Sequence, residues 1–383
     1  MKKTKIIHLM VIILGIIFVF IPAFHTNIWF DESYSVAIAN KGFSEIWTIT
    51  GHDVHPALYY WMLHIIYLIF GSKILIYRLF SVLAIAILGI LGYTHIRKDF
   101  GEKTGILFSF FTYFLPIMNT YAQEIRMYTW SCLIVTLMAI YGYRFYKSVK
   151  TNTSKNKIKN LCLFGLFSIC SCYIHYYALV TAGLINLILL IYLIKNRKQA
   201  KKDLRNFLIL AVIQVLLYIP WMIFFVVQLK HVGGGYWIQL SLIGTTVDVL
   251  SFQFKNQVDS NFTTDVKALS ALIMSVATYI YLIIKTVRYK KDGKDMKPIY
   301  LSTGIYIGVI LIILLVSIIS PILYARYLLV MTGLYIFTLS FIIAKEKSKI
   351  IPCVILRNYL NFSDMWKYTK HKGKLWSTKC RNI

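Results

Sequence analysis

Two adjacent carboxylates, Asp31 and Glu32, stand just beyond a long apolar run, in the stretch "IWFDESYS". The chain has only 15 acidic residues, and an unpaired carboxylate is costly to bury at the edge of a membrane segment. The two side chains are therefore expected to be solvated, paired or used in chemistry. Two interpretations stay open: a catalytic role, or a pair that favours the dipole at the start of the helix that follows.

A second polar stretch, "GHDVHPALYY", places His52, Asp53 and His55 just before Pro56. Imidazole and carboxylate groups at this spacing can bind a metal ion or orient a substrate hydroxyl. No third, distant ligand accompanies them, so capping of the helix that starts after Pro56 explains them better than a metal does. We predict no metal site and no tightly bound cofactor, and we leave a divalent cation unassigned.

The stretch "AQEIRMY" adds Gln123, Glu124, Arg126 and Tyr128 where two apolar runs meet. A charged glutamate and arginine at this depth are costly unless they pair with each other or with a ligand. One interpretation is an ion pair of Glu124 with Arg126 or with Arg78. Contact with a bound ligand is favoured, because few other cations occur outside the basic loops described below.

A further cation, Arg326, lies between Tyr324 and Tyr327 in "YARY", shortly after Pro321. A guanidinium held between aromatic rings at a bilayer interface can bind a phosphate through two parallel hydrogen bonds. The alternative is an aromatic-belt turn in which Arg326 meets lipid headgroups. The "HYY" stretch at 175–177 is typical of such a belt.

The elements that must position these residues are membrane helices. The chain has 383 residues, of which 58% are hydrophobic and 15% charged, and its mean hydropathy is +0.65. Recurring apolar runs of membrane length predict an all-α, polytopic transmembrane protein with about ten spans. We expect these spans near 6–24, 74–94, 104–120, 127–146, 161–177, 178–194, 207–227, 268–284, 299–319 and 328–344.

The apolar segment 57–70 decides the topology. It is too short for a span, which needs about 20 residues, and we predict that it lies at the membrane surface. Then 34 of the 42 Lys and Arg residues share one side with only 7 acidic residues, and the other side holds eight of each sign. This positive-inside bias predicts cytoplasmic termini and removes the support that a net charge of +27 lends to nucleic-acid binding.

All the polar stretches described above then fall on the outer face. Residues 25–73 form a long first outer loop with amphipathic surface helices, and residues 228–267 form a second outer loop with a flexible "GGG" turn. We expect one transmembrane domain over 1–344. Residues 345–383 are expected to be a basic cytoplasmic tail, either native or the mark of a truncated end.

The ordered set of motifs resembles the GT-C glycosyltransferases that use polyprenyl-phosphate sugars. It is closest to the bacterial branch related to protein O-mannosyltransferases and the lipid A aminoarabinose transferase. The resemblance rests on "FDESYSVAIA", "HDVHPALYYWMLHIIYLIFG", "YRLFSVLAIAILGILGY", "YAQEIRMYTW" and "ILYARYLLVMTGLY", in this order over roughly residues 6–344.

The resemblance implies the GT-C fold, the bacterial plasma membrane and an active site on the outer face. It implies an inverting transfer of a sugar from a lipid-linked polyprenyl phosphate donor to a hydroxyl of an extracytoplasmic acceptor, which is a glycan, a lipid or a protein. Asp31 would be the base and Glu32 its support. The other implied substrate contacts are His55, Gln123, Glu124, Arg126, Tyr128, Tyr324 and Arg326.

Two alternatives remain: a transporter or flippase of lipid-linked saccharides, and a non-catalytic relative. A transporter is expected to show inverted repeats and charges near the bilayer midplane. Here the polar residues gather at one boundary and we find no internal repeat, so the enzyme is favoured. Membrane lipids and the lipid-linked donor are the expected partners, with no nucleic acid among them.

Overall fold

The computed structural model describes residues 2–24, 27–153, 156–233, 238, 241–255 and 266–346, and within them the chain is helical without any β-strand. The helices are α1 (Lys2–Phe20), η1 (Ile21–Phe24), α2 (Phe30–Ala39), α3 (Phe43–Gly51), α4 (Leu58–Phe70), α5 (Ile74–Leu91), η2 (Gly92–Ile96), α6 (Arg97–Phe100), α7 (Glu102–Phe114), α8 (Pro116–Ala122), α9 (Tyr128–Lys150), α10 (Lys157–Ile174), α11 (Tyr176–Lys195), α12 (Lys201–Gly233), α13 (Leu242–Ser251), η3 (Phe252–Phe254), α14 (Val266–Lys291), α15 (Lys297–Ile319), η4 (Ala325–Met331) and α16 (Thr332–Ala344).

Eight membrane-length apolar segments occur among the described residues, compared with the ten that the sequence predicts. The expected span 104–120 is interrupted, because α7 ends at Phe114, Leu115 is extended, and Pro116 starts the separate helix α8. The expected span 127–146 is the continuous helix α9, whose tyrosines, threonines and serines lower its hydropathy. Many of these polar side chains are buried between neighbouring helices, where they do not meet lipid.

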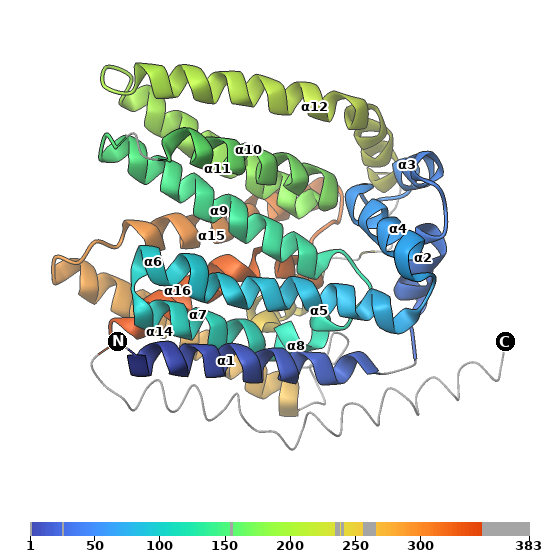
Figure 1. The fold of residues 1–383 in the computed structure, drawn as a ribbon, viewed down its shortest axis with the longest axis horizontal. Coiled ribbons are helices and arrows are strands. Elements are labelled where there is room, and N and C mark those ends of the chain that lie inside the picture. The colour runs from blue at the N-terminus through green and yellow to red at the C-terminus, as the bar shows by residue number, and fades with distance from the viewer. Residues whose placement is uncertain are drawn as a thin grey trace.

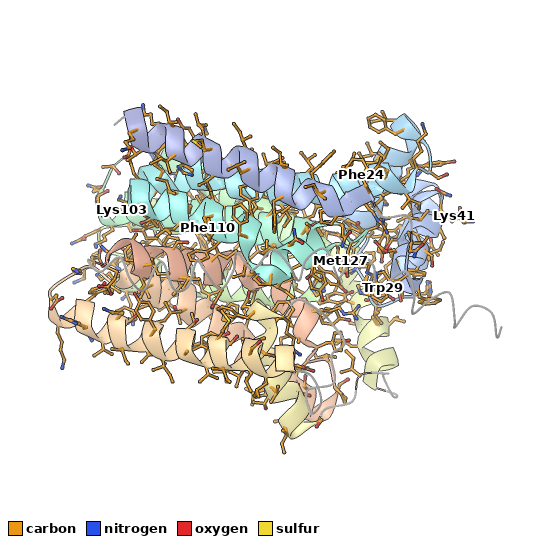
Figure 2. All side chains as sticks on the ribbon, turned by 90° about the horizontal axis from the view of Figure 1, so that it is seen from below. Phe24, Trp29, Lys41, Lys103, Phe110 and Met127 are labelled. Carbon is orange, nitrogen blue, oxygen red and sulfur yellow. The ribbon has the colours of Figure 1, made fainter. Side chains whose placement is uncertain are left out.

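The long helices run roughly side by side, and their connections separate into two ends (Figure 1). The short helices α2, α3 and α4 gather at one end, while the turns that follow α6, α9, α11 and α14 lie at the other. Figure 2 shows the same division, with Lys103 far from Trp29 and Lys41. Since α4 has 13 residues, it is about 20 Å long and too short to cross a bilayer of about 30 Å.

The second predicted outer loop is in part structured. Helix α12 continues to Gly233, and α13 with η3 returns the chain to the core, where Phe252, Gln253 and Phe254 are buried. The Gln253 amide donates to the hydroxyls of Tyr306 and Thr332. Segments 234–237, 256–265 and 347–383, with most of the "GGG" turn and of the predicted tail, lie outside the described residues.

Helix α12 connects the bundle to the surface helices. It contains Pro220 and is largely exposed along its apolar length. Near its C-terminal end, the Gln228 amide donates to the carbonyl oxygens of Thr50 and Gly51, at 2.9 and 3.0 Å. Tyr176 in turn donates to Gln228. The end of α3 is thereby attached to α12 by hydrogen bonds in a buried position.

Close packing around Tyr113 holds α1, α5 and α7 together. Its hydroxyl donates to the carbonyl oxygen of Ala86 at 2.9 Å, and its ring fills the space beside Gly15 and Gly89. A Cβ atom at Gly89 would lie 2.1 Å from Cζ of Tyr113, and one at Gly15 would lie 2.2 Å from a ring carbon. Small residues of this kind let membrane helices approach each other closely.

We therefore expect Gly89→Ala to lower the free energy of unfolding by about 1–3 kcal/mol, since the added methyl group displaces the Tyr113 ring. Thermal unfolding of the purified protein in detergent measures the change. Gly304→Ala is the matched control, because a Cβ there meets nothing within 4 Å. Equal melting temperatures for the two variants would contradict the packing described.

Candidate active site

An ion pair between Asp31 and Arg326 brings the first surface helix to the start of η4. Nη1 of Arg326 lies 3.2 Å from Oδ2 of Asp31, and the side chains are 8% and 30% exposed, respectively. The guanidinium also lies over the rings of Trp29 and Tyr324, at 4.9 and 4.8 Å from their centres, and donates to the Tyr324 hydroxyl. The cation is thus held by aromatic faces while Asp31 stays accessible.

A second guanidinium, that of Arg126, is buried behind this pair. Its Nη1 donates to the carbonyl oxygen of Asp31 at 3.3 Å and to Oγ of Ser35 at 3.4 Å, and its Nη2 donates to Nε2 of His55 at 3.3 Å. All three acceptors are uncharged groups. Within the described residues no carboxylate lies at ion-pair distance from Arg126, so the predicted alternative of a Glu124–Arg126 ion pair is not found.

His55 is a neutral imidazole in this arrangement. Its Nδ1 lies 3.2 Å from Oδ2 of Asp53, so Nδ1 carries the proton, and Nε2 accepts from Arg126. Burial lowers the pKa of His55 below its usual value, and the nearby Arg126 charge lowers it further, against the opposing effect of Asp53. A protonated His55 would place two positive charges in contact.

Glu32 differs from Asp31 in its surroundings, although the two are adjacent. Its side chain is only 4% exposed, and its carboxylate accepts hydrogen bonds from the backbone N–H groups of Ile125 and Trp29, at 3.0 and 3.2 Å. Nη2 of Arg78 lies 3.7 Å away and donates to the Asn27 carbonyl oxygen. Glu32 therefore ties the start of α2 to the turn between α8 and α9.

Aromatic rings form the inner wall of the cluster. Tyr128 packs edge-on against Tyr121 and His175, and His175 lies 5.0 Å from the ring of Tyr327. The His175 Nδ1 accepts from the backbone N–H of Tyr177 and so caps the N-terminus of α11. These rings exclude water from one side of the two arginines.

The structure brings most of the sequence-predicted residues into one cluster: Asp31, Glu32, His55, Arg126, Tyr128, Tyr324 and Arg326. Gln123 is half-buried at the end of α8 and makes no hydrogen bond to the cluster in the described part of the chain. Glu124 is buried, and its backbone carbonyl oxygen accepts from Ser81.

Two buried residues of the cluster were not predicted from the sequence. Arg78 was considered only as a partner of Glu124, and the structure brings it to Glu32. A lone arginine inside an apolar helix was the available signal for it. His175 was assigned to an aromatic belt, whereas it is 4% exposed and contacts Tyr128.

Among the described residues, no group of three or more His, Cys, Asp or Glu side chains is placed so that it could hold a metal ion. The pair of Asp53 and His55 engages in the hydrogen bonds given above. Around Asp31, the geometry offers an accessible carboxylate beside two buried guanidinium groups.

A comparison with protein families supports a relationship over part of the chain. The family described as dolichyl-phosphate-mannose-protein mannosyltransferase matches residues 54–224. The chain is related to the GT-C membrane glycosyltransferases. The GT-C match includes His55, Arg126 and Tyr128 and ends before Arg326, and Asp31 precedes it. A comparison with curated proteins found no match.

The environment of His55 predicts a pH dependence of stability. Because its folded pKa is lowered, the unfolded chain binds the proton more readily, so stability is full above about pH 6.5 and falls as the pH drops below it. Thermal unfolding scans between pH 7.5 and 5 should show a shallower loss for His55→Gln than for the unmodified chain. Parallel curves would argue against a neutral, buried His55.

Proposed function

We propose that the protein is an inverting glycosyltransferase that moves a sugar from a polyprenyl-phosphate donor to a hydroxyl of an extracytoplasmic acceptor. One observation carries the proposal: an accessible carboxylate, Asp31, adjoins two buried guanidinium groups, Arg126 and Arg326. A transfer from a lipid phosphate needs a base for the incoming hydroxyl and cations for the departing phosphate. The GT-C relationship supports the same chemistry.

In the proposed reaction, Asp31 takes the proton of the acceptor hydroxyl as its oxygen attacks the anomeric carbon of the sugar. The bond between that carbon and the phosphate oxygen breaks on the opposite face, which inverts the configuration. The bonding electron pair leaves with the polyprenyl phosphate. Arg126 and Arg326 stabilise the negative charge that develops there, since arginine binds phosphate oxygens through paired hydrogen bonds.

The contact between Asp31 and Arg326 gives donor binding a second effect. While Arg326 is paired with Asp31, one carboxylate oxygen of Asp31 is engaged in that contact. A donor phosphate competes for the same guanidinium, and Arg326 then turns from Asp31 towards the phosphate. The Asp31 oxygen that Arg326 occupied is then free to accept the hydrogen bond of the acceptor hydroxyl.

Glu32 and His55 have positioning roles in this proposal. Glu32 holds the backbone at Trp29 and Ile125, so it fixes Asp31 and Arg126 relative to each other. His55 orients the Arg126 guanidinium through Nε2. We place the site on the outer face of a bacterial plasma membrane, with both termini cytoplasmic. The acceptor is a cell-wall or lipid glycan, or a protein.

The base assignment is tested with purified protein and a panel of undecaprenyl-phosphate sugars, by following release of the lipid phosphate. Asp31→Asn is expected to lower turnover by about 10²–10⁴-fold, the usual contribution of a general base. Glu45→Gln is the matched control, because Glu45 is an exposed carboxylate on the neighbouring helix α3, paired with Lys41.

Turnover by Asp31→Asn equal to that of Glu45→Gln would contradict the assignment of the base. Movement of a lipid-linked saccharide across vesicles without release of lipid phosphate would indicate the flippase alternative. No turnover with any donor or acceptor would indicate a non-catalytic relative.

The role of Arg326 predicts a graded series. Arg326→Ala should reduce the turnover number by about 10²–10³-fold, as removal of one charge-stabilising donor does, and Arg326→Lys should recover part of it. Lys41→Ala, which removes an exposed cation at the same end, should have little effect. If Arg326→Ala altered only the KM for the acceptor, Arg326 would not be a phosphate contact.

A further inference from the structure

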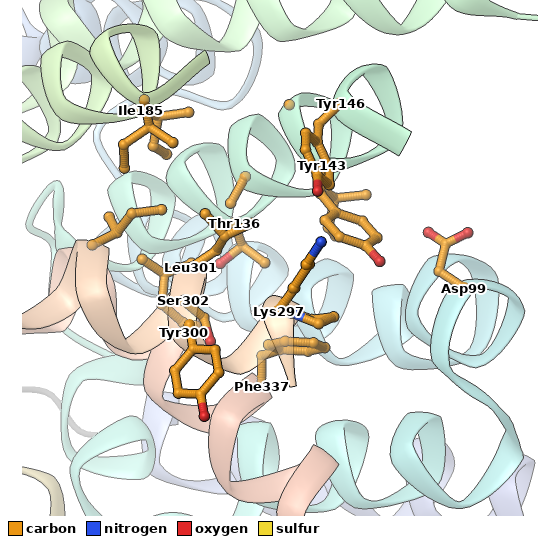
Figure 3. A pocket seen from close by; sticks show the side chains of 18 of the residues that line it. Asp99, Thr136, Tyr143, Tyr146, Ile185, Lys297, Tyr300, Leu301, Ser302 and Phe337 are labelled. Carbon is orange, nitrogen blue, oxygen red and sulfur yellow. The ribbon is translucent and has the colours of Figure 1, made fainter. Parts of the chain in front are cut away.

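A separate cavity lies between α9, α11, α15 and α16 and extends to Asp99 and Phe100 of α6 (Figure 3). The turn that follows α6 lies at the end of the bundle opposite to α2, α3 and α4 (Figure 1). The volume of the cavity is about 330 Å³. On α9 the lining runs from Thr136 to Tyr146, which corresponds to a depth of about 15 Å. The space is therefore a long, narrow slot that runs along the helices.

The lining of this slot is almost entirely apolar at depth. Ile140, Ile185, Leu189, Ile305 and Leu334 surround its inner part, and Ala139 and Gly142 leave the room for it on α9. A slot of this shape suits a single hydrocarbon chain. The hydroxyls of Thr136 and Ser302 also line it, and each is engaged in a hydrogen bond within the protein.

The deep end is closed towards the candidate active site. Gly333 packs so tightly on α9 that a Cβ atom there would lie 1.9 Å from Oγ1 of Thr136, and both residues are buried. At the other end Lys297 and Tyr300 are exposed. The slot therefore has its mouth at the end of the bundle that carries the basic loops.

Lys297 supplies a positive charge at the mouth, and the carboxylate of Asp295 accepts from the backbone N–H of Lys297. Asp99 lines the mouth but is paired with Arg144 at 2.7 Å, whereas no carboxylate of the described residues lies at ion-pair distance from Lys297. In Figure 3 the Lys297 side chain points towards Tyr143. The Lys297 amine and the tyrosine hydroxyls at the mouth can bind the phosphate of a lipid headgroup, and the apolar slot below them can hold the acyl chain of the same lipid.

We propose that this slot binds one acyl chain of an anionic phospholipid from the leaflet that faces the basic loops, with its phosphate at Lys297. The donor is a poorer occupant, because its phosphate belongs at Arg126 and Arg326 and the contact of Gly333 with Thr136 separates the two spaces. The bound acyl chain fills space beside α9 and α16. Helix α9 carries Tyr128, and α16 follows the η4 helix that contains Arg326.

Native mass spectrometry of the full chain in detergent tests this site with phosphatidylglycerol, phosphatidylcholine and undecaprenyl phosphate. One phosphatidylglycerol should be retained in preference to phosphatidylcholine. Ala139→Trp should abolish its retention by filling the slot, and Lys297→Gln should reduce the preference for it about fivefold, the effect of one lysine near an anionic headgroup.

Two matched controls accompany these variants. Leu187→Trp adds the same ring at an exposed position of α11, and Lys150→Gln removes a cation at the same end that does not line the slot. Retention should be unchanged in both. Ile188→Phe provides a second, smaller filling variant if Ala139→Trp fails to give a monodisperse helical protein.

Three results would overturn the proposal. The first is that the filling variant, Ala139→Trp or Ile188→Phe in its place, retains as much phosphatidylglycerol as Leu187→Trp does. The second is that the unmodified chain retains phosphatidylglycerol and phosphatidylcholine equally. The third is that an equal concentration of undecaprenyl phosphate displaces phosphatidylglycerol. Because the site lies apart from Asp31 and Arg326, none of these results depends on whether the chain transfers a sugar.

Discussion

The ion pair between Asp31 and Arg326 joins residues that are 295 positions apart in the chain. Each charge alone would be costly at the edge of a membrane, so the pairing favours one arrangement of α2 against η4. The rings of Trp29 and Tyr324 then cover the guanidinium, and the backbone of Asp31 meets Arg126. The position of the surface helices over the bundle depends on this contact.

The cluster separates two acidic neighbours by their surroundings. Glu32 is buried and its carboxylate is engaged with backbone N–H groups, whereas Asp31 remains partly open. Arg126 has uncharged acceptors, so its positive charge is not cancelled by direct pairing. In the resulting site, Glu32 fixes the backbone, and positive charge is in excess where a lipid phosphate is proposed to bind.

The general architecture could be predicted from the sequence because hydropathy and charge bias act over whole segments. The short helix α4 and the separation of basic loops from Asp31 follow from them. Details that depend on a single contact could not. Neither the pairing of Arg78 with Glu32 nor the burial of His175 has a signature in sequence spacing.

Breaks in regular structure were also beyond the sequence pattern. The apolar run 104–120 continues through Pro116, so hydropathy alone predicts one span where the backbone forms α7 and α8. Likewise, Gln253 looks like a loop residue until its amide is seen to satisfy two hydroxyls in the core. Pro116 is a local signal that hydropathy does not weigh, whereas the position of Gln253 is decided by tertiary packing.

The attachment of α3 to α12 makes the site sensitive to bilayer thickness. The segment Lys201–Lys230 has 30 residues, and its apolar part, 207–227, is about 32 Å long, close to a hydrocarbon core of about 30 Å. In a thinner bilayer such a helix tilts or bends, and Pro220 gives α12 a place to do so. Gln228 transmits that tilt to Thr50 and Gly51, and so to the loop that carries His55.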